Sequence, residues 1–258
     1  MFDPSVYDER FYAAEDVGRF ASASVVLSAL FKYYKPDSVV DFGCGLGHWL
    51  FICQQLGVEI IQGYDGHYVD TEKLKIPQET FARHEFEEPV NTQRSYGLAI
   101  SIEVGEHLPA SKADTFVESI TKSSDVVLFS AAAPYQGGVN HFNERPPAYW
   151  AEKFAQCGYL CFDFLRDELW DAADINCVHA QNILIFVKEN KRELFEGHNF
   201  SVQAAPPLKY HPEFVKIKLD TQGARKKKKH LRYYFLLPVQ LLIPGRRQRK
   251  RFSEWSKS

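Results

Sequence analysis

Ser38-Val-Val-Asp-Phe-Gly-Cys-Gly-Leu-Gly-His-Trp49 carries an apolar run into three closely spaced glycines and the start of a helix. Gly43, Gly45 and Gly47 can adopt positive φ and bring bare backbone close to a ligand, and the free N–H groups of a helix over residues 48–56 would point at the same place. A second apolar run ends in a carboxylate, Asp65, 18 residues after the last glycine. In doubly wound folds a carboxylate about 20 residues beyond such a turn accepts the hydroxyls of a ribose. The stretch therefore predicts a nucleotide-binding strand, turn and helix.

The glycine spacing separates two cofactor classes. A turn that binds pyrophosphate has the pattern GxGxxG, whereas Trp49 and Leu50 follow Gly47 here. The chain instead resembles the class I S-adenosylmethionine (SAM) methyltransferases, whose first motif reads acidic-x-G-x-G-x-G. The resemblance implies that Asp41 and the glycine turn hold the methionine end of SAM and that Asp65 holds its ribose.

Helical and strand-like patterns alternate along residues 21–187. The patterns predict helices over 21–34, 48–56, 110–122 and 146–157, and strands over 38–42, 60–64, 96–102, 125–132, 159–165 and 182–187. Such alternation is typical of a parallel sheet that helices cover on both faces. We predict an α/β fold with a doubly wound, mostly parallel seven-stranded sheet and helices on both faces, in which the final pair of strands could be antiparallel.

Length and composition are those of an ordinary globular protein. The 258 residues are 45% hydrophobic and 25% charged, which is enough for one sizeable core. Residues 1–19 carry acidic side chains and lack the basic start and apolar run of a secretory signal, so we expect a cytoplasmic protein. The five cysteines include no CxxC pair, which indicates reduced thiols and argues against a zinc site.

The predicted strand over 96–102 leads into Glu103-Val-Gly-Glu-His107. Ligands of open α/β sheets bind outside the carboxyl ends of the strands, so catalytic groups are expected here. On a helical turn, the i, i+3, i+4 spacing would put Glu103, Glu106 and His107 on one face. Some SAM-dependent O-methyltransferases carry an E-x-x-E-H motif at this place that binds a divalent metal. The resemblance implies four ligands for an ion such as Mg²⁺, which would lower the pKa of an acceptor hydroxyl: Glu103, Glu106, His107 and His141. The alternative is that the motif caps a helix and bonds to local backbone.

His141 lies in a turn-rich segment, residues 130–150, that follows a predicted strand. Loops on a rigid scaffold often carry function, and the imidazole pKa suits proton removal near neutrality. We therefore expect His141 to be the general base, with Glu106 and His107 beside it, and Glu103 to contact the cofactor. A histidine that only fixes turn geometry with a nearby asparagine is the other interpretation.

Several segments together resemble a bacterial group of methyltransferases, many of which are found with surface-glycan or secondary-metabolite genes. The segments are residues 7–12, 38–49, 63–70, 103–107, 140–150 and 180–186. The resemblance implies methylation of an oxygen on a sugar, a glycan or a related small-molecule acceptor. A metal-assisted RNA ribose methyltransferase and a catalytically silent SAM-binding scaffold are the alternatives.

Charge is divided unevenly along the chain. Residues 1–224 hold 19 Lys and Arg against 32 Asp and Glu, a net charge of −13, whereas residues 225–258 hold 12 against 1, a net charge of +11. We predict three parts: a methyltransferase domain over residues 1–190, a linker over 191–224 and a basic amphipathic tail over 225–258.

The tail has two basic clusters that flank an aromatic and leucine-rich stretch over residues 231–244. This stretch is too short to cross a bilayer, which needs about 20 apolar residues. We expect the tail to bind an anionic membrane surface, which would place the protein peripherally on the inner membrane face. Nucleic-acid binding is less favoured, and a solvated tail that folds back on the acidic body is a further alternative.

Overall fold

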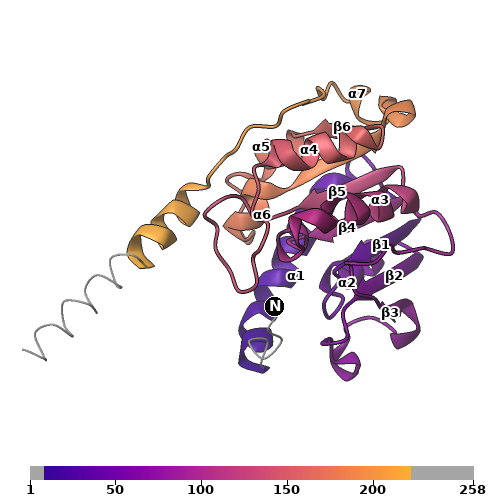
Figure 1. Ribbon diagram of the computed structural model, residues 1–258, viewed down its shortest axis with the longest axis vertical. Coiled ribbons are helices and arrows are strands. Elements are labelled where there is room, and N and C mark those ends of the chain that lie inside the picture. The colour runs from indigo at the N-terminus through magenta and orange to yellow at the C-terminus, as the bar shows by residue number, and fades with distance from the viewer. Residues whose placement is uncertain (1–8, 222–258) are drawn as a thin grey trace, which may run out of the picture. The chain divides into compact units, whose positions relative to one another are not determined.

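A seven-stranded sheet organises the part of the chain that the structure describes, residues 9–221 of a computed structural model, with side chains from residue 17 onward (Figure 1). The strand order is β3-β2-β1-β4-β5-β7-β6. The strands are β1 (Ser38–Phe42), β2 (Ile60–Asp65), β3 (Phe81–Arg83), β4 (Leu98–Ile102), β5 (Val126–Ser130), β6 (Tyr159–Phe162) and β7 (Leu184–Lys188). β1 to β5 pair in parallel, and β7 runs antiparallel to both β5 and β6. The predicted mostly parallel sheet is therefore confirmed.

Helices cover both faces of this sheet. They are α1 (Glu9–Phe31), α2 (His48–Gln55), α3 (Ala113–Ser123), α4 (Pro147–Gln156), α5 (Phe164–Leu169), α6 (Cys177–Asn182) and α7 (Glu193–Glu196). Successive strand residues point to opposite faces, so Val39 packs in a cluster with α1, α2 and α5, while Val40 packs in another with α3 and α4. Figure 1 shows α3 and α4 next to each other beside β5.

The region after β6 differs from its predicted structure. We expected a strand over 159–165, but β6 ends at Phe162 because Asp163 leaves the extended conformation, with φ −112° and ψ 19°. The next residues form α5, whose Leu165 and Leu169 are buried in the core. An apolar segment of this length fits either a strand or a helix, and packing decides between them. The edge strand β3 and the short helix α6 were also not predicted.

The chain continues as packed structure beyond β7. Val202 forms a bridge with Phe162, and the main compact unit ends at His211. A second unit begins with a helix over residues 212–221. The proposed domain boundary at residue 190 stays a prediction, and the predicted tail over 225–258 lies outside the described residues. No helix in the described part of the chain is both long and apolar enough to cross a bilayer.

Candidate active site

A cavity of about 1030 Å³ opens at the carboxyl ends of β1, β2 and β4. Asp41 comes from β1, Asp65 from the end of β2 and Glu103 from the residue after β4, and the loop after β5 adds His141. All the predicted site residues line this cavity except Gly47. The sheet topology therefore gathers residues from distant parts of the sequence at one edge, as the strand-end rule predicts.

The three glycines of the first turn have positive φ, at 89°, 54° and 86°, but for different reasons. A Cβ on Gly43 would lie 2.3 Å from the Val104 side chain, and a Cβ on Gly47 would lie 2.8 Å from the Ile76 side chain. Around Gly45 no atom lies within 4 Å of such a Cβ. Gly43 and Gly47 therefore permit internal packing, whereas Gly45 presents bare backbone to the open cavity.

Two buried carboxyl groups lie beneath this turn. Asp65 accepts hydrogen bonds from the amides of Gly45 (2.6 Å) and Gly66 (2.7 Å) and from the Tyr68 hydroxyl. Burial raises the pKa of Asp65. Asp41 has one buried carboxyl oxygen without a hydrogen-bond partner in the described residues, and burial together with the charge of Asp65 raises its pKa well above the usual range. Such a pair favours a ligand that donates hydrogen bonds or carries positive charge.

Glu103 lies at the centre of a buried polar network. Its backbone is left-handed, with φ 56°, which is uncommon for a residue other than glycine. Its carboxylate accepts hydrogen bonds from Ser130 Oγ (2.8 Å), Gln136 Nε2 (2.6 Å) and Asn182 Nδ2 (3.1 Å). Burial raises the pKa of Glu103, and these hydrogen bonds oppose the rise. The network joins the ends of β4 and β5 to the loop after β5, through Gln136, and to α6, through Asn182.

Glu106 and His107 belong to a short 3₁₀ turn, Gly105–His107. Because Glu103 lies outside this turn in the left-handed region, the three residues do not share one helical face, and that interpretation of their spacing was wrong. Glu106 is fully buried, and neither carboxyl oxygen has a hydrogen-bond partner among the described residues. Burial, followed by the charge of Glu103, raises the pKa of Glu106 well above its usual range.

The two histidines are held through their Nδ1 atoms. His107 Nδ1 lies 3.2 Å from the carbonyl oxygen of Asn140, which can only accept, so Nδ1 carries the proton. Burial lowers the pKa of His107 to about 4. His141 Nδ1 lies 2.9 Å from Glu144 Oε1, and the ring packs over Gly138, where a Cβ would lie 2.2 Å from His141 Nε2. Each histidine therefore has an Nε2 atom that these hydrogen bonds leave available.

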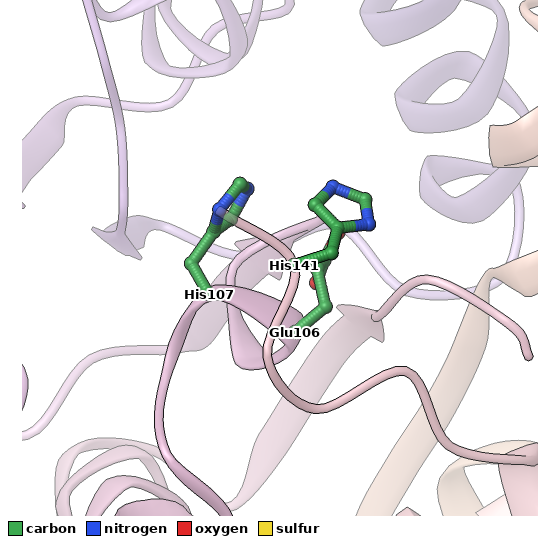
Figure 2. Close-up of side chains that lie close together, drawn as sticks. All are labelled: Glu106, His107 and His141. Atoms are coloured by element: carbon green, nitrogen blue, oxygen red, sulfur yellow. The ribbon is translucent and has the colours of Figure 1, made fainter. Parts of the chain in front are cut away.

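Figure 2 shows Glu106 and His107 on the same turn and His141 on the loop that crosses it, with the three side chains projecting to the same side. The two imidazole rings are perpendicular, with centroids 4.8 Å apart. One ligand atom from each of the three residues lies within 4.8 Å of the others. Glu103 is not in this group because its carboxylate belongs to the network with Gln136 and Asn182.

A family model described as "Methyltransferase domain" matches residues 13–205. The chain belongs to this family of methyltransferases. It is a SAM-dependent enzyme that transfers a methyl group, and the cavity at the strand ends has features suited to SAM. Gly45 leaves open space above bare backbone, and Asp41 has an unpartnered buried oxygen. No curated protein matches the methyltransferase in sequence.

Several solved methyltransferase structures resemble this chain at low sequence identity. An O-methyltransferase family protein from Burkholderia thailandensis is 13% identical, with a TM-score of 0.54 over 71% of this chain and 61% of that one. The methyltransferase domain of bacterial CtHen1-C is 18% identical, with a TM-score of 0.49 over 65% of this chain and 97% of that one. Magnesium protoporphyrin IX methyltransferase from Synechocystis PCC 6803, solved with bound SAM, is 19% identical, with a TM-score of 0.49 over 67% of this chain and 80% of that one.

Sequence reasoning missed several residues of the methyltransferase cavity and its loop. Tyr68 and Glu144 hold Asp65 and His141, while Arg19 and His179 line the cavity from α1 and α6. Glu144 had a local signal, since it lies three residues after His141. Tyr68 had the same kind of signal, since it lies three residues after Asp65. Arg19 and His179 reach the cavity through tertiary packing, and no local pattern marks them.

Proposed function

We propose that this methyltransferase moves a methyl group from SAM to a hydroxyl oxygen of a small-molecule acceptor, with a sugar or glycan as the favoured class. The observation that carries the proposal is the His141–Glu144 pair on the cavity loop. A hydroxyl is a weak nucleophile until its proton is removed, and a histidine held by a carboxylate is suited to that task. Resemblance to the bacterial group associated with glycan genes supports the acceptor class.

The proposed reaction is a single in-line displacement. The oxygen of the acceptor forms a bond to the methyl carbon as the bond from that carbon to the sulfonium sulfur breaks. The hydroxyl proton passes to His141 Nε2, and Glu144 stabilises the resulting imidazolium through Nδ1, 2.9 Å away. Neutral His107 lies beside this base without adding positive charge, because burial keeps its pKa low.

The cofactor is proposed to lie along the first turn. Asp65 would accept the ribose hydroxyls, and Asp41 with Gly43, Gly45 and Gly47 would hold the methionine end, where SAM carries positive charge. Glu103, fixed by its three hydrogen bonds, would face the same end. This charge pattern supports SAM because its sulfonium and ammonium groups are attracted by buried carboxylates.

A metal-assisted version of the same reaction is the second candidate. The observation that favours it is Glu106, a fully buried carboxyl group without a hydrogen bond in the described chain. His107 and His141 could also bind through Nε2, because another group holds each Nδ1, an arrangement common among metal ligands. A divalent ion there would supply Lewis-acid activation of the acceptor hydroxyl.

A screen for the methyl acceptor and two variants, His141→Ala and Glu144→Gln, test the hydroxyl mechanism. Glycan and lipid-linked fractions are incubated with ¹³C-methyl SAM, and NMR of the products distinguishes methyl on oxygen from methyl on nitrogen. His141→Ala should lower kcat by about 10²- to 10⁴-fold, the range for loss of a general base. Glu144→Gln should lower kcat less, with little change in the KM for SAM. Methyl on nitrogen, or full activity in His141→Ala, would contradict the hydroxyl mechanism.

Removal of metal separates the two candidates. Under the metal-free mechanism, treatment with chelator leaves kcat unchanged and Glu106→Gln has a small effect. Under the metal-assisted mechanism, chelator abolishes activity, added Mg²⁺ or Mn²⁺ restores it, and Glu106→Gln weakens that restoration.

A further inference from the structure

The segment over residues 202–211 is anchored to β6 and to the end of α5. The amide of Gln203 donates a hydrogen bond to the carbonyl oxygen of Cys161 in β6 (2.8 Å). At the other end of the segment, His211 Nε2 lies 2.8 Å from the carbonyl oxygen of Trp170, directly after α5. The family match ends at residue 205, so the last residues of this segment are held in place although they lie beyond the match.

Tyr210 contacts the loop that carries His141. Its hydroxyl donates a hydrogen bond to the carbonyl oxygen of Pro134 (2.7 Å). Pro134 lies in a turn, residues 133–136, that a backbone hydrogen bond closes between its first and last residues (3.0 Å). Tyr135 in this turn has φ 66°, a left-handed conformation that is unfavourable for a residue other than glycine. The Tyr210 hydroxyl therefore stabilises a turn with a strained backbone.

The amide of His211 reaches the same turn through buried side chains. It donates to Gln181 Oε1 (3.0 Å), and Gln181 Nε2 donates to Gln136 Oε1 (3.3 Å). Gln136 Nε2 donates in turn to Glu103 Oε2 (2.6 Å). Because a backbone N–H can only donate and a carboxylate can only accept, the two ends of this chain of bonds fix the orientation of both amide groups.

The turn is connected to the proposed base through Glu144. The amide of Gly137, the first residue after the turn, donates to Glu144 Oε1, which also lies 2.9 Å from His141 Nδ1. Burial, and then the charges of Tyr135 and Glu144, raise the pKa of Tyr210, so the Tyr210 hydroxyl lies near the same carboxylate. A shift of the turn would therefore move the carboxylate that holds the base.

We propose that Tyr210 and Gln181 are positioning residues for methyl transfer, which hold the turn over residues 133–136 and, through it, His141. Neither side chain lines the cavity, so both act through the turn and not on a substrate. A displacement of about 1 Å at a reacting group can cost about 100-fold in rate. The inference rests on the proposed function only in that this loop carries the general base.

Hydrogen exchange measured by mass spectrometry tests the positioning without an acceptor. The full chain is saturated with S-adenosylhomocysteine, the demethylated product of SAM, and exchange is followed in peptides that cover residues 133–146. Tyr210→Phe removes only the hydroxyl and should speed exchange there by about 3- to 10-fold, the range for one lost hydrogen bond. Gln181→Met should also speed it, and in the double variant the two effects should not multiply, because both act on one turn.

Tyr34→Phe is the matched control. The Tyr34 hydroxyl also donates to a backbone carbonyl oxygen at 2.7 Å, that of Gly97, and neither residue lines the cavity. The two tyrosine variants should lose similar amounts of stability in urea, because each loses one partly buried hydrogen bond to the backbone. Only Tyr210→Phe should change exchange over residues 133–146.

The acceptor found in the ¹³C-methyl screen provides a second measurement. Tyr210→Phe should lower kcat by about 10-fold while the KM for SAM stays within about twofold, and Tyr34→Phe should keep the wild-type kcat. A role in stability alone would leave kcat unchanged in both variants.

Unchanged exchange over residues 133–146 in Tyr210→Phe would overturn the inference, as would faster exchange with a wild-type kcat. Unchanged exchange in Gln181→Met would remove Gln181 from it. Faster exchange and a lower kcat, with the methyl group found on nitrogen, would overturn the proposed acceptor chemistry and support the positioning role.

Discussion

Buried carboxyl groups dominate the site at the scale of single residues. Asp41 and Glu106 are both buried, and each has at least one carboxyl oxygen without a partner among the described residues. Burial raises the pKa of both groups well above the usual range, because the charged form of a buried carboxyl group is costly when it has no partner. A cationic ligand removes this cost, and the site is therefore built for a ligand with positive charge.

A substitution at Gly138 tests how the proposed general base, His141, is positioned. Its missing side chain makes room for the His141 ring, since a Cβ there would lie 2.2 Å from Nε2. Gly138→Ala should displace the ring and lower kcat by about 10²-fold, toward the loss expected for His141→Ala. Affinity for S-adenosylhomocysteine should change by less than about twofold, because the first turn is untouched. In the double variant Gly138→Ala, His141→Ala, the two losses in kcat should not add. A wild-type kcat in Gly138→Ala alone would contradict the proposed role of Gly138 in positioning the His141 ring.

The buried side chain of His179 should make the free energy of unfolding depend on pH. Its pKa is lowered to about 4 in the folded protein, by burial and then by Arg19, against an ordinary value of 6.5. Between these values the unfolded chain binds more protons, so this contribution to the free energy of unfolding is lost as pH falls from about 6.5 to about 4. The loss amounts to about 3 kcal/mol.

Urea unfolding of the wild type and His179→Phe measures that contribution. The variant should lose about 3 kcal/mol less than the wild type between pH 7 and pH 4. The comparison cancels the other titrating groups, including His107. Parallel pH profiles for the two proteins would show that His179 is not held neutral by burial.

Residues of the first turn could be predicted from the sequence because their relations are local. The glycines, Asp41 and Asp65 follow one another through a single strand, turn, helix and strand. Arg19 and His179 reach the same cavity from positions 160 residues apart in the sequence, and only the packing of α6 beside α1, where Asn176 N donates to Ser22 Oγ (2.8 Å), brings them together. Single-sequence patterns contain no signal for such a contact.

At the scale of elements, strands buried on both faces were the easiest to predict. β1, β5 and β7 are buried along most or all of their length and are mostly apolar, as central strands covered on both faces usually are. β3 was missed because it has three residues and pairs only with β2 at the edge of the sheet. The first residues of α5 were predicted to continue β6, because a short apolar run fits both the strand and the helix period. In the structure the chain turns at Asp163, and α5 begins at the next residue.

Arg166 of α5 links elements that are distant in the sequence. The side chain is fully buried, donates two hydrogen bonds to the Asp163 carboxylate, and also donates to the carbonyl oxygens of Gln181 (3.1 Å) and Pro207 (2.9 Å). Arg166→Met should lower the free energy of unfolding by about 3 kcal/mol, because Asp163 is left buried without its main partner. Lys209, 3.9 Å from that carboxylate, keeps the loss at the lower end of the range.

A surface pair provides the control for Arg166→Met. Arg192 and Glu196 form an exposed ion pair at α7, so Arg192→Met should leave the free energy of unfolding nearly unchanged. A second replacement, Asp163→Leu, should recover most of the loss in Arg166→Met. Equal effects of Arg166→Met and Arg192→Met in urea unfolding would contradict the linking role.

At the scale of the whole molecule, charge divides the chain into two regions. Residues 1–224 have a net charge of −13, and residues 225–258 have a net charge of +11. The acidic region includes the cavity, whose six carboxyl groups make it a poor site for a polyanion such as RNA. The basic region is separate in the sequence from every cavity residue, so its partner need not be the acceptor.

We predict that the basic region binds an anionic membrane surface and is not needed for cofactor binding. The full chain should sediment with vesicles that contain phosphatidylglycerol at low salt, and should remain in solution with vesicles of phosphatidylcholine alone. Changing the four lysines of residues 226–229 to glutamine should weaken vesicle binding by up to about 4 kcal/mol, at about 1 kcal/mol for each charge near the surface. Affinity for S-adenosylhomocysteine should stay the same, which shows that the variant folds. A full chain that stays in solution with anionic vesicles at low salt would contradict the membrane role. Tight, salt-dependent RNA binding that is lost when the four lysines are changed to glutamine would assign the basic region to nucleic acid.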